Sequence, residues 1–137
     1  MTKRKLMFVD DDLDMIALYE HAAATTDTMI AVQTGGLSAL KLLNSFHYNI
    51  DAIVIDLSLP DIDGITLTQQ IRTNESLRSI SPIPIFWWTC YPYDEKSTND
   101  SIVSAARRLN VIDVFKKPED VIEIVKKVHA RLDFLSE

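Results

Sequence analysis

The chain has 137 residues, of which 47% are hydrophobic and 25% are charged. This length and composition are typical of one globular domain with a single core, and they exclude a largely disordered chain. The formal net charge of −6 argues against non-specific binding to nucleic acid, which needs a surplus of Lys and Arg.

The sequence shows no segment that would direct the chain to a membrane or out of the cell. Its apolar runs are far shorter than a membrane-spanning helix, and its N-terminus lacks the apolar core of a signal peptide. The single cysteine, Cys90, cannot form an internal disulfide, which agrees with a reducing compartment. We therefore expect a cytoplasmic protein that neither inserts into a membrane nor contacts nucleic acid directly.

Short apolar runs alternate along the chain with segments of helical spacing. In chain order, the predicted strands cover residues 5–9, 28–34, 53–55, 83–88 and 111–115. A helix is predicted after each strand. The buried positions predicted for these five helices are, in chain order, Ile16, Tyr19 and Ala23; Leu37, Leu40, Leu43 and Phe46; Ile65, Leu67, Ile71 and Leu77; Ile102, Ala105, Ala106 and Leu109; and Val121, Val125, Val128, Leu132 and Leu135.

Five strands that alternate with five helices predict an α/β domain, in which helices cover both faces of a parallel sheet. The sequence contains no repeat, low-complexity segment or linker. We therefore expect residues 1–137 to form a single domain.

Charged and polar side chains follow four of the predicted strands at their carboxyl ends. Asp10 and Asp11 follow the first strand, Asp56 the third, Thr89 the fourth and Lys117 the fifth. Ligands bind at this edge in open parallel α/β sheets, because the loops and the helix N-termini converge there. Carboxylates that lie close together repel one another, so either one takes up a proton or a cation lies among them.

An oxygen-only cluster that is open to solvent suits Mg²⁺ better than a soft metal, and Mg²⁺ often bridges carboxylates to phosphate oxygens. The residue types therefore predict phosphoryl chemistry. Asp56 would be the nucleophile and would form an acyl phosphate. Mg²⁺ and Lys117 would neutralise the charge that grows on the phosphoryl oxygens, and Thr89 would donate a hydrogen bond to one of them.

Four segments together resemble the receiver domain of two-component response regulators. They are Val-Asp-Asp-Asp at 9–12, Asp-Leu-Ser-Leu-Pro-Asp-Ile-Asp-Gly at 56–64, the strand-terminal Thr89, and the pair Lys117-Pro118. The resemblance covers nearly the whole chain. It implies a flavodoxin-like, doubly wound sheet of five parallel strands in the order 2-1-3-4-5. It also implies a stand-alone, CheY-like receiver domain over residues 1–137, with no output domain.

The resemblance implies a role in a phosphorelay. Asp56 would accept a phosphoryl group from the phosphohistidine of a sensor histidine kinase or a histidine phosphotransfer protein. The Mg²⁺ ligands that it implies are Asp11, Asp56, the main-chain carbonyl of Ser58 and, through water, Asp10. Thr89 and Lys117 would contact the phosphoryl group and alter the face of the fourth helix, fifth strand and fifth helix, which would bind an unidentified protein target. Only self-catalysed phosphorylation and slow autodephosphorylation are expected, and no enzymatic turnover.

Two other functions remain open. A phosphatase of the haloacid dehalogenase type would use Asp10 as the nucleophile and Asp12 as the acid. This reading explains less, because Asp56 would have no role and because that chemistry needs a further acidic pair after the lysine on a strand of its own. A receiver-like scaffold that works without phosphorylation is suggested by Val114, where the family usually has an aromatic residue, and by the long polar segment 90–100.

Several other residues are expected to be structural. Asp12 and Asp14 are predicted helix caps, and Asp61 and Asp63 are predicted turn and first-turn acids of the helix that follows them. Trp87 and Trp88 are expected in the core, one on each face of the sheet. Cys90 is expected to be buried. The surface histidines are predicted to be His21, His47 and His129.

Overall fold

The structure, a computed structural model, describes residues 3–46, 49–90 and 101–136. Five parallel strands form one sheet in the order β2-β1-β3-β4-β5. They are β1 (Lys5–Val9), β2 (Met29–Gln33), β3 (Ala52–Asp56), β4 (Ile85–Thr89) and β5 (Asp113–Lys116). The predicted fold class and strand order are therefore confirmed, although β5 begins two residues later than the pattern predicted.

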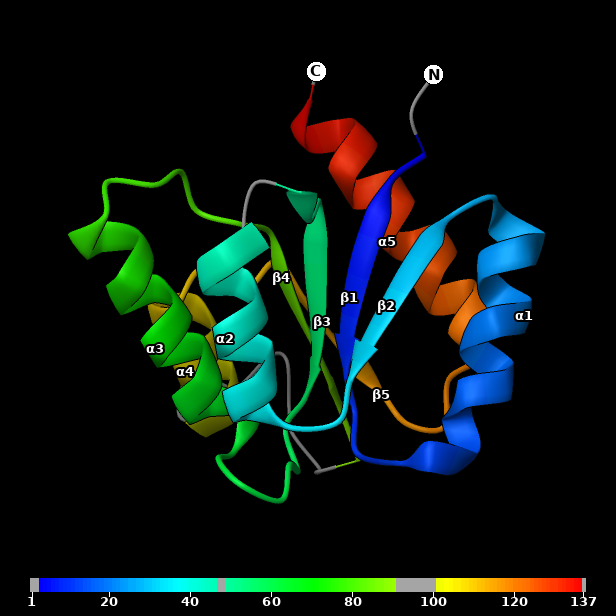
Figure 1. Cartoon of the computed structure of the whole chain (residues 1–137), viewed down its shortest axis with the longest axis horizontal. Helices are drawn as coiled ribbons and strands as arrows, with labels where there is room; N and C mark the ends of the chain where they lie inside the picture. The colour runs from blue at the N-terminus through cyan, green and yellow to red at the C-terminus, as the bar shows by residue number, and fades with distance from the viewer. Residues whose placement is uncertain (1–2, 47–48, 91–100, 137) are drawn as a thin grey trace.

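The strands alternate with five α-helices, and a single 3₁₀ turn, η1 (Leu13–Met15), precedes the first. The helices are α1 (Ile16–Thr26), α2 (Gly36–Phe46), α3 (Gly64–Leu77), α4 (Ser101–Arg108) and α5 (Val121–Leu135). Figure 1 shows that α1 and α5 cover one face of the sheet, whereas α2, α3 and α4 cover the other. None of the described helices is long and apolar enough to cross a membrane.

Two hydrophobic cores lie on the two faces of the sheet. Successive side chains of a strand point to opposite faces, so Trp87 packs in the core beneath α2, α3 and α4, and Trp88 in the core beneath α1 and α5. The indole N–H of Trp87 donates to the Thr68 hydroxyl over 2.9 Å. The prediction of one tryptophan on each face is therefore confirmed.

Three leucines that the helical spacing predicted to be buried are exposed. Leu37 is 56%, Leu77 79% and Leu135 54% exposed. Each lies in the first or last turn of its helix. For Leu77 and Leu135 the cause is helix length, because α3 has 14 residues and α5 has 15. Helices of about 21–22 Å extend beyond five-residue strands of about 17 Å, so their last side chains have little to pack against.

The residue that directly follows β4 differs from the prediction. Cys90, which was predicted to be buried, is exposed just past the end of β4. The rest of the long polar segment, residues 91–100, lies outside the described residues, as does His47.

Candidate functional site

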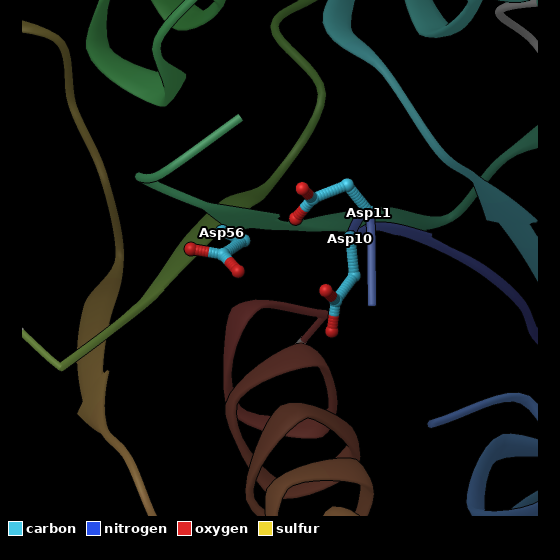
Figure 2. A group of neighbouring side chains, drawn as sticks. All are labelled: Asp10, Asp11 and Asp56. Atoms are coloured by element: carbon cyan, nitrogen blue, oxygen red, sulfur yellow. The ribbon is translucent and has the colours of Figure 1, made fainter. Parts of the chain in front are cut away.

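Three carboxylates gather where β1 and β3 end, at the carboxyl edge of the sheet. Asp10 and Asp11 follow the last residue of β1, and Asp56 is the last residue of β3. One carboxylate oxygen of each lies within 4.8 Å of the others, and Figure 2 shows the three groups around a common space. Asp10 and Asp56 are buried, whereas Asp11 is exposed, so the cluster is open to solvent on one side.

Asp56 is fixed by two hydrogen bonds, one to each carboxylate oxygen. The main-chain N–H of Ser58 donates to Oδ1 over 2.9 Å, and the Lys117 ammonium donates to Oδ2 over 2.8 Å. The Asp56 side chain is almost buried, with 7% of its surface exposed. Its position therefore depends on both the loop that follows β3 and the residue that follows β5.

Lys117 is the cation that faces this cluster. Its main-chain N–H donates to the carbonyl of Thr89 over 2.8 Å, which continues the pairing of β4 with β5. Its Nζ also lies 5.1 Å from the centre of the Trp88 ring, a distance typical of a cation–π contact. Burial alone would lower the pKa of the ammonium, but the hydrogen bond to Asp56 and the charges of Asp10 and Asp56 outweigh this and raise the pKa. Lys117 is therefore a full positive charge at neutral pH.

Asp10 accepts a hydrogen bond on each oxygen. The main-chain N–H of Asp12 donates to Oδ1 over 3.0 Å, and the hydroxyl of Tyr19 in α1 donates to Oδ2 over 2.7 Å. Burial, the hydrogen bond to Asp10 and the negative charges nearby raise the pKa of the Tyr19 phenol, so it stays protonated. The sequence placed Tyr19 only on the buried face of its helix and gave no signal for the partner of its hydroxyl.

The loop from β3 to α3 is anchored at both of its ends. At Gly64, a Cβ atom would lie 2.7 Å from the Asp56 carbonyl oxygen and 2.8 Å from the Cα of Leu57, so only glycine fits there. Asp63, predicted as an acid of the first turn, is instead the N-cap of α3 and accepts from the N–H of Thr66. The loop that carries Ser58 therefore enters α3 in one defined path.

Asp61 lies in the bend before α3, where a turn acid was predicted, but its side chain bonds to another helix. Its carboxylate accepts hydrogen bonds of 2.9 Å from the main-chain N–H groups of Gly36 and Leu37, at the start of α2. These bonds lower its pKa to about 2. The sequence gave no signal for this contact, because the donor groups lie more than 20 residues away along the chain.

Most of the residues predicted for the site meet at one place. The carboxylates of Asp10, Asp11 and Asp56 and the ammonium of Lys117 share the carboxyl edge of the sheet. Thr89 ends β4, is 1% exposed and follows the residue that pairs with Asp56 in the sheet. In the described part of the chain, the three carboxylates are the only group of three His, Cys, Asp or Glu side chains that could hold a metal ion.

Comparisons with known proteins agree with this arrangement. A family model described as the response regulator receiver domain matches residues 6–129. Transcriptional regulatory protein PrrA of Mycobacterium tuberculosis is 26% identical over 132 residues, which are 96% of this chain and 51% of PrrA. The chain therefore spans about half the length of this relative.

Two solved structures are similar in fold. A putative response regulator from Chloroflexus aurantiacus has a TM-score of 0.76 and 24% identity, over 96% of this chain and 99% of that one. The co-crystal structure of the Saccharomyces cerevisiae histidine phosphotransfer signaling protein Ypd1 with the receiver domain of Ssk1 has a TM-score of 0.74 and 21% identity, over 91% and 86% of the two chains. Because the family model matches most of the chain, the chain belongs to the response regulator receiver domains of two-component signalling.

Proposed function

We propose that this receiver domain accepts a phosphoryl group on Asp56 from a phosphohistidine of a sensor histidine kinase or a histidine phosphotransfer protein. The observation that carries the proposal is the surroundings of Asp56. This carboxylate lies with two others within 4.8 Å, and a lysine ammonium bonds to it over 2.8 Å. A structural acid would need only the lysine, whereas the excess of negative charge has no structural use.

In the proposed step, an oxygen of Asp56 forms a bond to phosphorus while the bond between phosphorus and the donor's imidazole nitrogen breaks. The imidazole leaves with the electron pair of that bond and takes up a proton from solvent. The product is an acyl phosphate on Asp56. Lys117 stays beside the acceptor and donates to a phosphoryl oxygen, and the Thr89 hydroxyl donates to another.

The donor set of the cluster fits Mg²⁺, because it consists of oxygen atoms only, carries excess negative charge and has one exposed member, Asp11. In the proposal Asp11, Asp56 and the main-chain carbonyl of Ser58 hold the ion, and Asp10 reaches it through water. When bound, Mg²⁺ supplies the positive charge that offsets the charge on the transferring phosphoryl group.

The downstream effect would pass through the residues that touch the phosphoryl group. Thr89 ends β4, and Lys117 follows β5, which precedes α5. A change in their hydrogen bonds would alter the face formed by α4, β5 and α5, and with it the affinity for a protein target. The proposed domain has no substrate turnover beyond its own phosphorylation and the slow loss of the phosphoryl group.

The phosphatase alternative fits the geometry less well. Its nucleophile, Asp10, has 2% of its surface exposed. Both of its oxygens already accept hydrogen bonds, from Asp12 and Tyr19. An attacking oxygen would have to lose one of these bonds, whereas Asp56 already lies 2.8 Å from the ammonium of Lys117.

The test is phosphorylation by acetyl phosphate in the presence of Mg²⁺, followed by intact mass. We expect one added phosphate in the wild type, none in Asp56→Asn, and a reduced but detectable amount in Asp10→Asn. Asp27→Asn, which changes an exposed acid at the C-terminal end of α1, is the control and should behave like the wild type. Phosphate on Asp56→Asn but not on Asp10→Asn would favour the phosphatase, and no phosphate on the wild type would favour the scaffold.

A further inference from the structure

Asp10 is a buried acid that forms no ion pair with the described residues. It has 2% of its surface exposed and lies with two other carboxylates within 4.8 Å. The ammonium of Lys117 is hydrogen-bonded to Asp56 and not to Asp10. The charge of Asp10 is therefore stabilised by two neutral donors, the N–H of Asp12 and the hydroxyl of Tyr19.

Tyr19 is itself held rigidly. Its ring lies 4.7 Å from the ring of Phe8, which in turn lies 6.3 Å from that of Trp88. The carboxylate of Asp12 caps η1, the turn that leads into the helix of Tyr19. Asp10 is thus linked to the turn η1 through the N–H of Asp12 and to α1 through the hydroxyl of Tyr19.

The hydroxyl is not needed to fill space. A phenylalanine would make the same ring contacts with Phe8 and would leave the Asp10 oxygen without its donor. A buried acceptor that loses its partner is costly, and the side chain can relieve the cost by turning toward solvent. An Asp10 that turns away would no longer face Asp11 and Asp56.

We propose that Tyr19 is a positioning residue, whose hydroxyl holds Asp10 in the orientation that the Mg²⁺ site needs. This inference rests on the proposed function, because it assumes that the three carboxylates bind Mg²⁺. Tyr19 does not contact the ion or the phosphoryl group. It acts through Asp10, because its hydroxyl keeps the Asp10 carboxylate facing Asp11 and Asp56 before the ion binds.

The expected effect of Tyr19→Phe is weaker Mg²⁺ binding with little change in the phosphorylation step. Apparent affinity falls in proportion to the fraction of molecules whose site is competent, and we expect a dissociation constant about three to ten times higher. At saturating Mg²⁺ the rate of phosphorylation should stay within about twofold of the wild type, since Asp56 and Lys117 are unchanged.

The experiment uses Mg²⁺ itself as the probe. Titration calorimetry gives the dissociation constant, and phosphorylation by acetyl phosphate at increasing Mg²⁺ gives the half-saturating concentration and the maximal rate. Ala22→Gly is the matched control. Ala22 is buried in α1 like Tyr19, three residues further along, but its side chain has no polar atom that could bond to Asp10. Glycine weakens the helix without touching the site.

The inference predicts weaker Mg²⁺ binding in Tyr19→Phe and unchanged binding in Ala22→Gly. An unchanged dissociation constant in Tyr19→Phe, or equal weakening in both variants, would overturn it, since a merely structural hydroxyl would behave like the control. A wild type that binds no Mg²⁺ would also overturn it. A wild type that binds Mg²⁺ but takes up no phosphoryl group would overturn the proposed function alone.

Discussion

The two edges of the sheet use buried charge in opposite ways. At the carboxyl edge, three acids share one lysine, and like charges face one another across less than 5 Å. At the amino edge, where the strands begin, buried charged groups meet groups of opposite charge or complementary hydrogen-bonding groups.

Arg72 and Glu75 form a largely buried ion pair at the amino edge. Arg72 Nη1 lies 2.9 Å from Glu75 Oε1, and its other donors bond to the carbonyls of Leu109 and Ile83. Glu75 is 4% exposed and also accepts from the main-chain N–H of Ile83 over 2.6 Å. This pair ties α3 to the residues that precede β4 and β5.

A second brace joins the starts of β1 and β2 to α5. Arg4 donates to Nδ1 of His129 over 3.0 Å and pairs with Asp133. Because Arg4 can only donate, Nδ1 must be the acceptor, so Nε2 carries the proton and donates to the Thr28 hydroxyl over 2.7 Å. The histidine, predicted to lie at the surface, is instead partly buried among these groups.

The comparison separates charge that holds the fold from charge that is available for a ligand. Breaking a matched buried pair leaves an uncompensated charge and should cost stability. Removing one of several repelling acids should cost little stability but should remove the response to a cation. Three variants test this division.

The largest expected effect is that of Arg72→Ala at the amino edge. It removes the arginine that pairs with the buried Glu75 carboxylate over 2.9 Å, and we expect a loss of about 3 kcal/mol in the free energy of unfolding. Urea unfolding followed by circular dichroism measures it. Arg107→Ala, which changes an exposed arginine of α4, should stay within about 0.5 kcal/mol of the wild type. A small effect of Arg72→Ala would mean that the matched pair is not what stabilises this edge.

The second largest effect is the loss, in Asp11→Asn, of the stability that Mg²⁺ gives to the folded state at the carboxyl edge. At an ion concentration one hundred times the dissociation constant, binding to the folded state alone should stabilise the wild type by about 2.7 kcal/mol. Asp11→Asn should lose most of this gain and, without Mg²⁺, should unfold at no lower urea concentration than the wild type. Urea curves with and without Mg²⁺ give both quantities. A large loss of stability in the absence of Mg²⁺ would place Asp11 with the structural charges.

The smallest effect is a pH dependence at the second brace. Burial and the nearby Arg4 lower the pKa of His129 in the folded state, although Asp133 and Asp51 oppose this. In the unfolded chain a histidine titrates near pH 6.5, so below that pH the unfolded state binds a proton more readily than the folded state. Stability should therefore be full above about pH 6.5 and should fall as the pH decreases through the interval below it.

His129→Gln tests this dependence, because a glutamine amide can accept from Arg4 and donate to Thr28 without titrating. The difference in unfolding free energy between pH 7.5 and pH 5.5 should be smaller in the variant than in the wild type. An identical difference in the two proteins would assign the acid sensitivity to other groups.

The fold and the location of the site could be predicted from local patterns. Apolar runs and helical spacing gave the order of elements, and strand ends placed Asp10, Asp11, Asp56 and Lys117 at one edge. Such a prediction works because parallel strands bring their carboxyl ends together whatever the details of packing.

The contacts that hold these groups could not be predicted in the same way. The Tyr19 hydroxyl, the cap that Asp61 gives to α2, and the pairing of Arg4 with His129 depend on side chains from elements that meet only in the folded chain. Hydrophobic spacing shows which face of a helix is buried but not which polar atom reaches which partner. Exposed Leu135 and Cys90 show the same limit at the ends of elements.

The two adjacent tryptophans give the domain a built-in optical probe. Trp88 lies beneath the Lys117 ammonium and one residue before Thr89, whereas Trp87 faces the opposite core with its indole N–H bonded to Thr68. Emission from Trp88 should therefore respond when Lys117 changes its partner, while Trp87 supplies a constant background. Replacing Trp87 by phenylalanine would leave a single native fluorophore beside the acceptor, so that events at Asp56 could be followed in real time without an added dye.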